Sequence, residues 1–389
     1  MNQFVTPAIR FTGIDVPSAD LFEQQYRLPH GMSYNSYVII DSKIAVMDSV
    51  EAGSGMRWIR SVEEATGGRQ PDYLVVHHME PDHSSCVAMA MDRWPGLMLV
   101  ASAKAISMLP QFFPGRDFAD RAIAVKEGDV LDLGTHHLTF YAAPMVHWPE
   151  VMVSYESSER VLFSADAFGK FGSLQYADEW INEARRYYMN IVAKYGNQVQ
   201  SLLRKLTAPP IDVIAPLHGP VLRGHLGYYV KLYDTWSRYQ PECRGVLVAY
   251  ASIYGGTEEA AVHIADVLRS KGVGDVTVMN LCLCDMSEAV AQAFRHSAMV
   301  VAAPTYDAGI FPAMHDFLYH LVIKGYRNRI VGVVENGSWA PVAGRLMRKM
   351  LETLPGITFA GDTVTIRSRI TADDETALAG LACEICKGI

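Results

Sequence analysis

Four side chains that often bind metal ions lie close together in the sequence, between positions 78 and 83. They follow an apolar run that ends at Val76 and is typical of a buried strand, and they precede an apolar stretch typical of a helix. Side chains alternate along an extended segment, so His78, Glu80 and Asp82 fall on one side and His83 turns in beside them. This spacing predicts a metal site at the end of a strand.

The same design returns at three later positions. His147 lies on a turn bracketed by prolines, Asp166 follows one apolar strand-like run, and His218 follows another. Strand ends at one edge of a sheet bring together residues that are distant in sequence. The seven side chains are enough for two metal ions that share one carboxylate. Because no thiolate is among them, they suit zinc, iron or manganese rather than copper(I) or an iron–sulfur cluster.

A second pattern lies in the last third of the chain. After an apolar strand that ends at Tyr250, residues 251–257 combine two glycines with two hydroxyl side chains and lead into a helix near Glu258. Glycines let the backbone turn its amide hydrogens inward, and the start of a helix favours an anion, so the segment predicts a phosphate site. No Gly-x-Gly-x-x-Gly follows the strand, which argues against a dinucleotide-binding Rossmann loop.

The elements that must position these residues suggest two domains, since 389 residues are too many for one ordinary core. Residues 1–242 alternate strand-like and helix-like segments, with one long helix expected over 178–206, and predict an α/β domain with mixed sheets. Residues 240–243 are the expected linker. Residues 243–389 hold four continuous apolar strands with helical stretches between them, which predicts a doubly wound parallel sheet like that of flavodoxin.

The amino-acid composition limits the kinds of partner and location that we expect for this protein. The formal net charge is -8, and Lys and Arg are scattered, so we expect no nucleic-acid partner. No stretch approaches the roughly 20 apolar residues of a membrane span, and no leader is evident, so we expect no membrane association and a cytoplasmic protein. The six cysteines are expected to be reduced thiols; a zinc site made from the pairs at 282/284 and 383/386 is the less favoured alternative. His296 and the other remaining histidines are expected to have structural or solvent roles.

The order and context of the seven metal-binding side chains resemble the metallo-β-lactamase fold, and specifically its flavodiiron branch, the A-type flavoproteins. Hydrolytic members carry His-x-His-x-Asp-His, whereas this chain has His-x-Glu-x-Asp-His with Glu80 at the second position. Glu80 replaces a neutral imidazole with an anionic oxygen donor, which favours two iron ions over a hydrolytic metal pair. The resemblance implies an N-terminal metallo-β-lactamase-like αβ/βα sandwich followed by a flavodoxin-like domain.

The family pattern also assigns roles. It implies that one iron is bound by His78, Glu80 and His147, that the other is bound by Asp82, His83 and His218, and that Asp166 bridges them. The family further places a tryptophan and a tyrosine near the metals, for which Trp148 and Tyr195 are the candidates. His77 points away from the cluster by alternation and is expected to lie outside the ligand set.

The glycine-rich loop resembles the flavodoxin phosphate loop, with Tyr254 where a small hydroxyl residue often lies. Two further strand-end loops resemble the flavin loops of the family and fit an isoalloxazine ring, with Tyr306 and Trp339 placed to stack on it. The resemblance therefore implies an FMN site. Its residues are expected to be Ser252, Ile253, Tyr254, Gly255, Gly256, Thr257, Pro304, Thr305, Tyr306, Asp307, Ala308, Gly309, Asn336, Gly337, Ser338 and Trp339.

These features favour a flavodiiron oxidoreductase that reduces dioxygen to water, nitric oxide to nitrous oxide, or both, with FMN relaying electrons to two irons. The expected electron donor is external, either a rubredoxin or a reduced flavin-type coenzyme. A head-to-tail homodimer, or a dimer of such dimers, is expected to bring the FMN of one subunit to the irons of the other. Two alternatives stay open: a dizinc hydrolase joined to a flavodoxin module, and a nonenzymatic electron carrier with a vestigial metal site.

Overall fold

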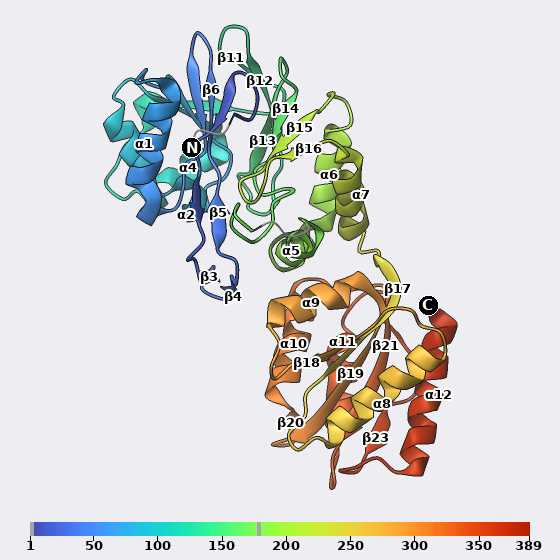
Figure 1. The fold of residues 1–389 in the computed structure, drawn as a ribbon. Coiled ribbons are helices and arrows are strands. Elements are labelled where there is room, and N and C mark those ends of the chain that lie inside the picture. The colour runs from blue at the N-terminus through green and yellow to red at the C-terminus, as the bar shows by residue number, and fades with distance from the viewer. Residues whose placement is uncertain (1–3, 177–179) are drawn as a thin grey trace. The chain divides into compact units, whose positions relative to one another are not determined.

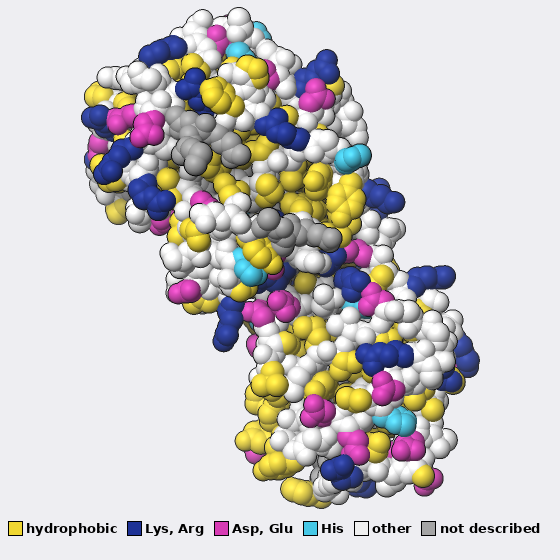
Figure 2. Space-filling view, viewed as in Figure 1, with side chains coloured by type: hydrophobic (Ala, Val, Ile, Leu, Met, Phe, Trp, Pro, Cys, Tyr) yellow, Lys and Arg dark blue, Asp and Glu magenta, His cyan; other side chains and the backbone are white. Residues whose placement is uncertain are grey.

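The computed structural model describes residues 4–176 and 180–389. The chain divides into two compact units (Figure 1). Unit 1 comprises Met1–Tyr188 and Asn197–Asp234, and unit 2 comprises Met189–Gly196 and Thr235–Ile389. On the face shown in Figure 2, basic side chains are interspersed with acidic ones, so the net negative charge is not gathered in one patch there.

Unit 1 is a sandwich of two six-stranded sheets. The first contains, in spatial order, β1 (Ile9–Phe11), β6 (Tyr37–Ile40), β7 (Ile44–Met47), β8 (Tyr73–Val76), β9 (Met98–Ser102) and β10 (Ala122–Val125). The second contains β11 (Val130–Asp132), β12 (His137–Ala142), β13 (Met152–Glu156), β14 (Val161–Phe163), β15 (Val213–Ala215) and β16 (Leu222–Arg223). Alternate residues such as Tyr37, Ile39, Phe140 and Phe163 meet between the sheets in one apolar core.

Helices cover the outer faces of both sheets (Figure 1). The first sheet is covered by α1 (Gly55–Thr66), α3 (Val87–Arg93) and α4 (Ala103–Phe112), and the second by α5 (Trp180–Tyr187), α6 (Gly196–Lys205) and α7 (Leu226–Ser237). With both faces covered, the central strands β6 to β8 are buried almost throughout, which explains their continuous apolar sequences. The layers are those of the expected αβ/βα sandwich.

Strand direction decides where the site forms. In the second sheet, β12 and β14 both run antiparallel to β13, and β15 runs parallel to β14. The carboxyl ends of β12, β14 and β15 therefore lie at the same edge of the sheet. Residues from the loops that follow them can reach one another although they are up to about 70 positions apart in sequence.

The long helical segment expected over residues 178–206 is present from Trp180 to Lys205, but it is not one regular α-helix; Asp178 and Glu179 lie outside the described residues. From Trp180 on, α5 is followed by a π-helical turn (Tyr188–Val192), a 3-10 turn (Ala193–Tyr195) and α6. A Cβ atom at Gly196 would collide with the Ser237 carbonyl oxygen. The close approach of that backbone is the physical reason why a glycine stands at this junction.

Unit 2 has a parallel sheet with the order β18-β17-β19-β21, continued by β22 and β23, while the short β20 pairs antiparallel with β19. Its strands are β17 (Cys243–Tyr250), β18 (Val276–Asn280), β19 (His296–Tyr306), β20 (Gly309–Ile310), β21 (Ile330–Asn336), β22 (Thr358–Phe359) and β23 (Val364–Ile366). One face carries α8 (Gly256–Ser270) and α12 (Ala372–Gly388); the other carries α9 (Met286–Arg295), α10 (Pro312–Ile323) and α11 (Ala343–Leu351). This is the expected doubly wound, flavodoxin-like arrangement. Among the described helices of both units, none is long and apolar enough to cross a bilayer.

Candidate functional site

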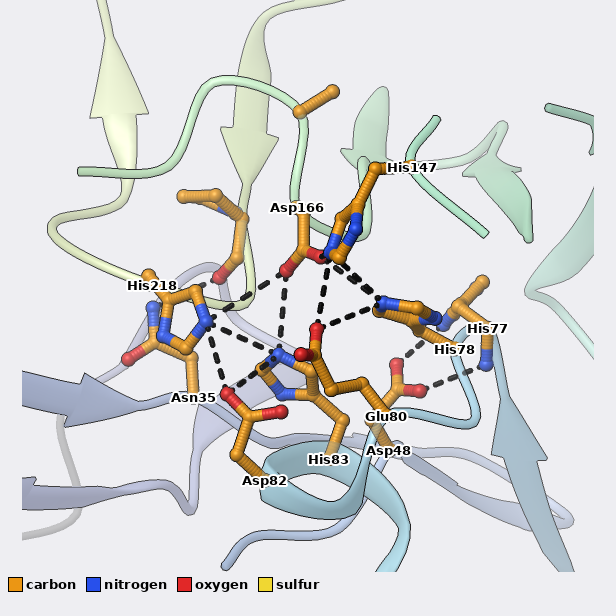
Figure 3. Close-up of polar contacts among 12 residues, drawn as sticks. Asn35, Asp48, His77, His78, Glu80, Asp82, His83, His147, Asp166 and His218 are labelled. Carbon is orange, nitrogen blue, oxygen red and sulfur yellow. Dashed lines mark hydrogen bonds and ion pairs between the residues drawn. The ribbon is translucent and has the colours of Figure 1, made fainter. Parts of the chain in front are cut away.

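The seven side chains predicted to bind metal lie together in unit 1 (Figure 3). Glu80 precedes the short helix α2 (Pro81–Ser84), whose first turn carries Asp82 and His83, so the chain turns sharply and aims all three side chains at one place. The remaining ligand candidates come from the loops after β8, β12, β14 and β15. They form two groups, namely His78, Glu80, His147 and Asp166, and Asp82, His83 and His218.

Asp166 faces both groups with different oxygen atoms. Its Oδ2 lies 3.2 Å from His78 Nε2 and 3.1 Å from His147 Nε2. Its Oδ1 lies 3.2 Å from His83 Nε2 and 3.7 Å from His218 Nε2. In the first group, Glu80 Oε2 lies 3.0 Å from His147 Nε2 and 3.2 Å from His78 Nε2. This is the arrangement of donor atoms that two metal ions with one shared carboxylate require.

The burial of the ligand atoms shows whether metal ions fit between the two groups of side chains. Both carboxylate oxygens of Asp82 and of Asp166 are buried, and they receive no hydrogen bond of good geometry from the described residues. The Nε2 atoms of His83 and His218 lie only 3.1 Å apart, which is close enough for both to bind the same cation. Buried carboxylates and converging imidazole nitrogens are costly without a cation, so the chemistry of the donors fits metal.

The pKa values in the metal-free chain show the same crowding of buried charged groups. Burial by itself raises the pKa of Asp166, but the charge of His78 and the other imidazoles holds it well below its ordinary range. Burial by itself lowers the pKa of His147, but contacts with Asp166 and Glu80 outweigh burial and raise that pKa to about 9. Without metal, protons on the imidazoles balance the carboxylates, and metal ions would replace those protons.

Two hydrogen bonds on the side away from the cluster orient the imidazole rings of His78 and His218. His78 Nδ1 lies 2.8 Å from Glu150 Oε1, which also accepts a hydrogen bond from the Met79 amide at 2.9 Å. His218 Nδ1 donates to the Ser33 carbonyl oxygen at 2.8 Å. With Nδ1 occupied as a donor, the Nε2 lone pair of each ring faces the cluster. Sequence reasoning missed Glu150; its place three residues after His147, on the same turn, was the available signal.

His77 lies outside both groups, as alternation predicts. Its Nδ1 lies 2.5 Å from Asp48 Oδ2 and its Nε2 lies 2.8 Å from Ser154 Oγ, and all three side chains are buried. The Asp48 carboxylate also accepts the His77 amide at 2.7 Å. This chain of contacts fixes the backbone one residue before His78.

Aromatic rings enclose the cluster. The Trp148 ring lies 5.3 Å from the His78 ring between centroids, so Trp148 is placed beside the metal-binding side chains. Tyr195, in contrast, lies in the segment Met189–Gly196 of unit 2, where its ring contacts the Lys194 ammonium group. Two tyrosines pack against the cluster: the Tyr187 ring lies 5.5 Å from the His218 ring, and the Tyr34 ring lies 5.9 Å from it. Tyr187 and Tyr188 are adjacent in an amphipathic segment, so the sequence alone predicts that both are core residues. The register of α5 is needed to show which of the two tyrosines faces His218.

In unit 2 the three predicted loops enclose a pocket of about 540 Å³. From the expected set, the pocket is lined by Ser252, Ile253, Tyr254, Gly256, Thr257, Pro304, Thr305, Asp307, Ala308, Asn336, Gly337, Ser338 and Trp339. Gly255, Tyr306 and Gly309 belong to the same loops but do not line the pocket, and Ala340, Ser368 and Arg369 line it without having been predicted.

The glycine-rich loop has the backbone that an anion site needs. Gly255 takes a left-handed conformation with φ of 87° and immediately precedes α8, and its amide donates to Ser252 Oγ at 3.1 Å. At Gly256 a Cβ atom would collide with the Ser368 carbonyl oxygen, so only glycine fits. The amides at the start of α8 are therefore open to a phosphate group.

Comparison with known proteins supports both units. Residues 32–219 match the family model described as ODP family beta lactamase. The chain is 27% identical over 374 residues to the rubredoxin-oxygen oxidoreductase of Megalodesulfovibrio gigas, covering 93% of this chain and 91% of that protein. It is 28% identical over 331 residues to the nitric oxide reductase of Moorella thermoacetica, covering 83% and 82%.

Solved structures show the same fold over the full length. Rubredoxin oxygen:oxidoreductase from Desulfovibrio gigas superposes with a TM-score of 0.93 at 24% identity, over 100% of this chain and 98% of that one. The flavodiiron protein from Giardia intestinalis also reaches a TM-score of 0.93, at 22% identity, over 100% and 96%. These comparisons confirm the resemblance drawn from the metal and phosphate motifs: the chain is similar in sequence to named nitric oxide and oxygen reductases, and it has the fold of flavodiiron proteins over its full length.

Proposed function

We propose that this protein is a flavodiiron oxidoreductase that reduces dioxygen to water, nitric oxide to nitrous oxide, or both. The observation that carries the proposal is Asp166, whose two oxygens face two separate groups of imidazoles and carboxylates in a chain that also has a flavin-type pocket. The relatives named as a nitric oxide reductase and a rubredoxin-oxygen oxidoreductase support the same reaction class.

The residues present fit two irons and FMN. One iron would be held by His78, Glu80 and His147, the other by Asp82, His83 and His218, and Asp166 would bridge them. The FMN phosphate would bind the amides before α8, and its ring would lie among the loops at 304–309 and 335–339. When bound, the iron pair supplies electrons and positive charge to the gas, and FMN replenishes those electrons from the donor.

The chain's own residues prepare this site. Asp166, Glu80 and Asp82 supply three negative charges to two dications, which favours iron in its higher oxidation state. Glu150 and the Ser33 carbonyl hold imidazole rings in the orientation that presents Nε2. The rings of Trp148, Tyr187 and Phe22 border the histidines and restrict the access of water.

We further propose that the electron donor is a separate protein or coenzyme, with a rubredoxin favoured over a reduced flavin-type coenzyme because of the names of the relatives. A head-to-tail homodimer, or a dimer of such dimers, would pair the FMN of one subunit with the irons of the other. All six cysteines are free thiols in the described chain, which supports a location in the reducing cytoplasm.

The decisive experiment is anaerobic reduction of the purified protein followed by rapid mixing with dioxygen or nitric oxide. We expect the bound flavin to reoxidise much faster than free FMN with at least one gas, and we expect two irons per chain by metal analysis. The matched variant Asp166→Ala should keep its flavin and reoxidise no faster than free FMN. Reoxidation of the wild-type protein at the free-flavin rate with both gases would overturn the proposal.

Metal content separates the dizinc alternative. Two zincs and no iron per chain after anaerobic preparation, together with hydrolysis of an ester or thioester, would identify a hydrolase joined to a flavodoxin module. A nonenzymatic electron carrier would show no difference in gas consumption between the wild-type chain and Asp166→Ala.

A further inference from the structure

Unit 2 contains a second group of metal-binding side chains that the proposed reaction does not use. Cys243, Asp275 and His296 each offer one donor atom, and these three atoms lie within 4.8 Å of one another. Cys243 begins β17, His296 begins β19, and Asp275 directly precedes β18. The flavin-type pocket forms at the carboxyl ends of the same strands, so the group lies at the opposite edge of the sheet.

From this group we infer a binding site for one zinc ion or a similar divalent transition metal. The donors are a thiolate, an imidazole and a carboxylate, which is a combination that zinc accepts, with a fourth position left for water. His296 Nε2 and Asp275 Oδ1 lie 3.2 Å apart, which is the separation of two neighbouring ligands on a tetrahedral ion bonded at roughly 2.0–2.1 Å.

The orientation of His296 supports a metal more than a simple hydrogen bond. His296 Nδ1 lies 2.7 Å from the Gln292 carbonyl oxygen, which can only accept, so Nδ1 carries the proton. In the neutral ring, Nε2 then presents a lone pair to the Asp275 carboxylate, which is also an acceptor. A backbone carbonyl that fixes the tautomer in this way is the usual support of a metal-binding histidine.

The local backbone is shaped for this close approach. A Cβ atom at Gly245 would lie 2.7 Å from the Asp275 carbonyl oxygen and 2.8 Å from His296 Cδ2. Glycine therefore allows β17 to pass between Asp275 and the buried imidazole. Sequence spacing could not reveal the group, because its members are 21 to 32 positions apart in order and are joined only by the pairing of three parallel strands.

The surrounding donors are compatible with an ion. Arg295 binds the other carboxylate oxygen, Asp275 Oδ2, at 2.5 Å, so Oδ1 can still coordinate metal. Arg295 and Thr277 each approach His296 Nε2 at 3.3 Å, the long end of the hydrogen-bond range, and the metal would displace these two contacts. On binding, the Cys243 thiol releases its proton to solvent, and the thiolate and carboxylate neutralise the dication.

Zinc K-edge X-ray absorption tests the inference on the full-length protein, loaded with iron and FMN and then given one equivalent of zinc. The method is selective for zinc, and the seven-residue cluster contains no sulfur, so zinc–sulfur scattering would show that zinc is bound by a cysteine outside that cluster, and the variants below identify which cysteine it is. We expect one sulfur neighbour at about 2.3 Å together with nitrogen and oxygen neighbours at about 2.0–2.2 Å.

Variants give the test its controls. Cys243→Ser should lose the sulfur neighbour, and His296→Gln should weaken zinc binding at least by the roughly 10- to 100-fold that loss of even an outer-shell partner costs. Cys284→Ser is the matched control, since Cys284 is a partly buried thiol of the same unit whose pKa burial likewise raises to about 11, and it should behave as wild type. Unchanged flavin content shows that each variant is folded.

Two results would overturn the inference. One is zinc surrounded only by nitrogen and oxygen in the wild-type protein, which would mean that Cys243, Asp275 and His296 form a hydrogen-bonded network alone. The other is a sulfur neighbour that persists in Cys243→Ser, which would place the zinc at another cysteine. Because the irons stay bound throughout, failure here leaves the gas-reduction proposal untouched.

Discussion

Under the proposed function, Glu80 is the side chain whose chemical type favours an iron centre over a hydrolytic one. Its Oε2 lies within 3.2 Å of two imidazole nitrogens, those of His78 and His147. An anionic donor there raises the negative charge around the two metal positions and favours iron over zinc. The type and position of Glu80 could be recognised in the sequence because it stands inside a short motif.

Tyr187 supplies the first prediction. Its hydroxyl is buried and has no hydrogen-bond partner among the described residues, and burial together with Asp166 raises its pKa well above the ordinary value, so it stays protonated. In Tyr187→Phe we expect flavin reoxidation by the gas to slow by roughly 100-fold, the lower end of what a positioned proton donor contributes. The same change should leave the free energy of unfolding equal or raise it by up to about 1 kcal/mol.

Tyr326→Phe is the control for this prediction. Tyr326 is also buried, and its hydroxyl likewise lacks a partner within the described chain, but it lies in unit 2 against Phe294. It should gain the same stability and keep the full reaction rate. Equal rates in both variants would show that Tyr187 only packs against His218.

The second prediction concerns pH and His147 in the metal-free protein. Its folded-state pKa is about 9, above the ordinary 6.5, because contacts with Asp166 and Glu80 outweigh burial. A raised pKa means that the folded state binds the proton more tightly than the unfolded state. This stabilisation is complete below about pH 6.5 and is lost as pH rises through about 9, with a slope of at most roughly 1.4 kcal/mol per pH unit.

Metal binding has the opposite dependence on pH. Iron or zinc must displace the proton from His147, so metal affinity rises over the same pH interval in which the metal-free chain weakens. Urea unfolding of metal-free and metal-loaded protein at pH 6.5, 7.5 and about 9 measures both trends. Parallel trends in the two forms would show that His147 does not bind the metal.

At the scale of elements, the strands decide which side chains meet. The carboxyl ends of β12, β14 and β15 share an edge, and the β5–β6 segment, with β5 at Met32–Tyr34, holds the loop of His218 against them. Asn35 carries this contact: its amide nitrogen donates to the Pro216 and Gly219 carbonyl oxygens at 2.8 Å each, and its backbone amide donates to Leu217 at 2.8 Å.

The third prediction is that Asn35→Ala weakens one metal position more than the other. The Gly219 carbonyl loses its Asn35 donor, and the Pro216 carbonyl keeps only the Tyr37 hydroxyl, so we expect a loss of about 1–3 kcal/mol in unfolding free energy. The loop of His218 should loosen, and chelator challenge should remove the metal near His218 roughly 10- to 100-fold more easily. Metal content after such a challenge should fall from two toward one per chain.

Asp41→Asn is the control at the other end of β6. The Asp41 carboxylate accepts the Thr135 and His136 amides at 2.7 Å each, far along the strand from the cluster. This variant can lower stability but should keep both metals. Loss of both metals together in Asn35→Ala would show that the two positions fill as one unit.

The elements also show how far the sequence could be read. Buried strands such as β8 and the candidate metal ligands at their ends were predictable, because continuous apolar runs and short motifs are local signals. The π-helical and 3-10 turns within residues 180–205 were not, because neither apolar periodicity nor a local motif marks where an α-helix changes its hydrogen-bond pattern. Glu150 and Tyr187 were missed because their roles depend on contacts with His78 and His218, which sequence spacing does not encode.

For the whole molecule, the central question is how electrons pass from a flavin in one unit to metals in the other. The two candidate sites lie in separate compact units of the chain. A closed head-to-tail dimer would pair each flavin with the metals of the other subunit and would give two identical reaction centres. The dimer therefore predicts that activity can be restored between two inactive variants.

The fourth prediction uses that complementation. Asp166→Ala lacks the bridging carboxylate but keeps the pocket, and Ser252→Trp fills the pocket but keeps the metal ligands. If the two chains are co-expressed in equal amounts and pair at random, about half of the dimers are mixed, and each mixed dimer holds one complete pair of sites out of two. If electron transfer runs between subunits, as the proposed dimer requires, co-expression gives about a quarter of the wild-type rate of gas consumption.

Transfer within a single chain gives the opposite result, because neither variant then holds both a flavin and a complete metal site. Co-expression would yield no more activity than each variant alone. Flavin absorbance and metal analysis of the separate variants confirm that each has lost only one site. A purified mixed dimer, isolated through two different affinity tags, should then have about half of the wild-type rate, which removes the assumption of random pairing from the comparison.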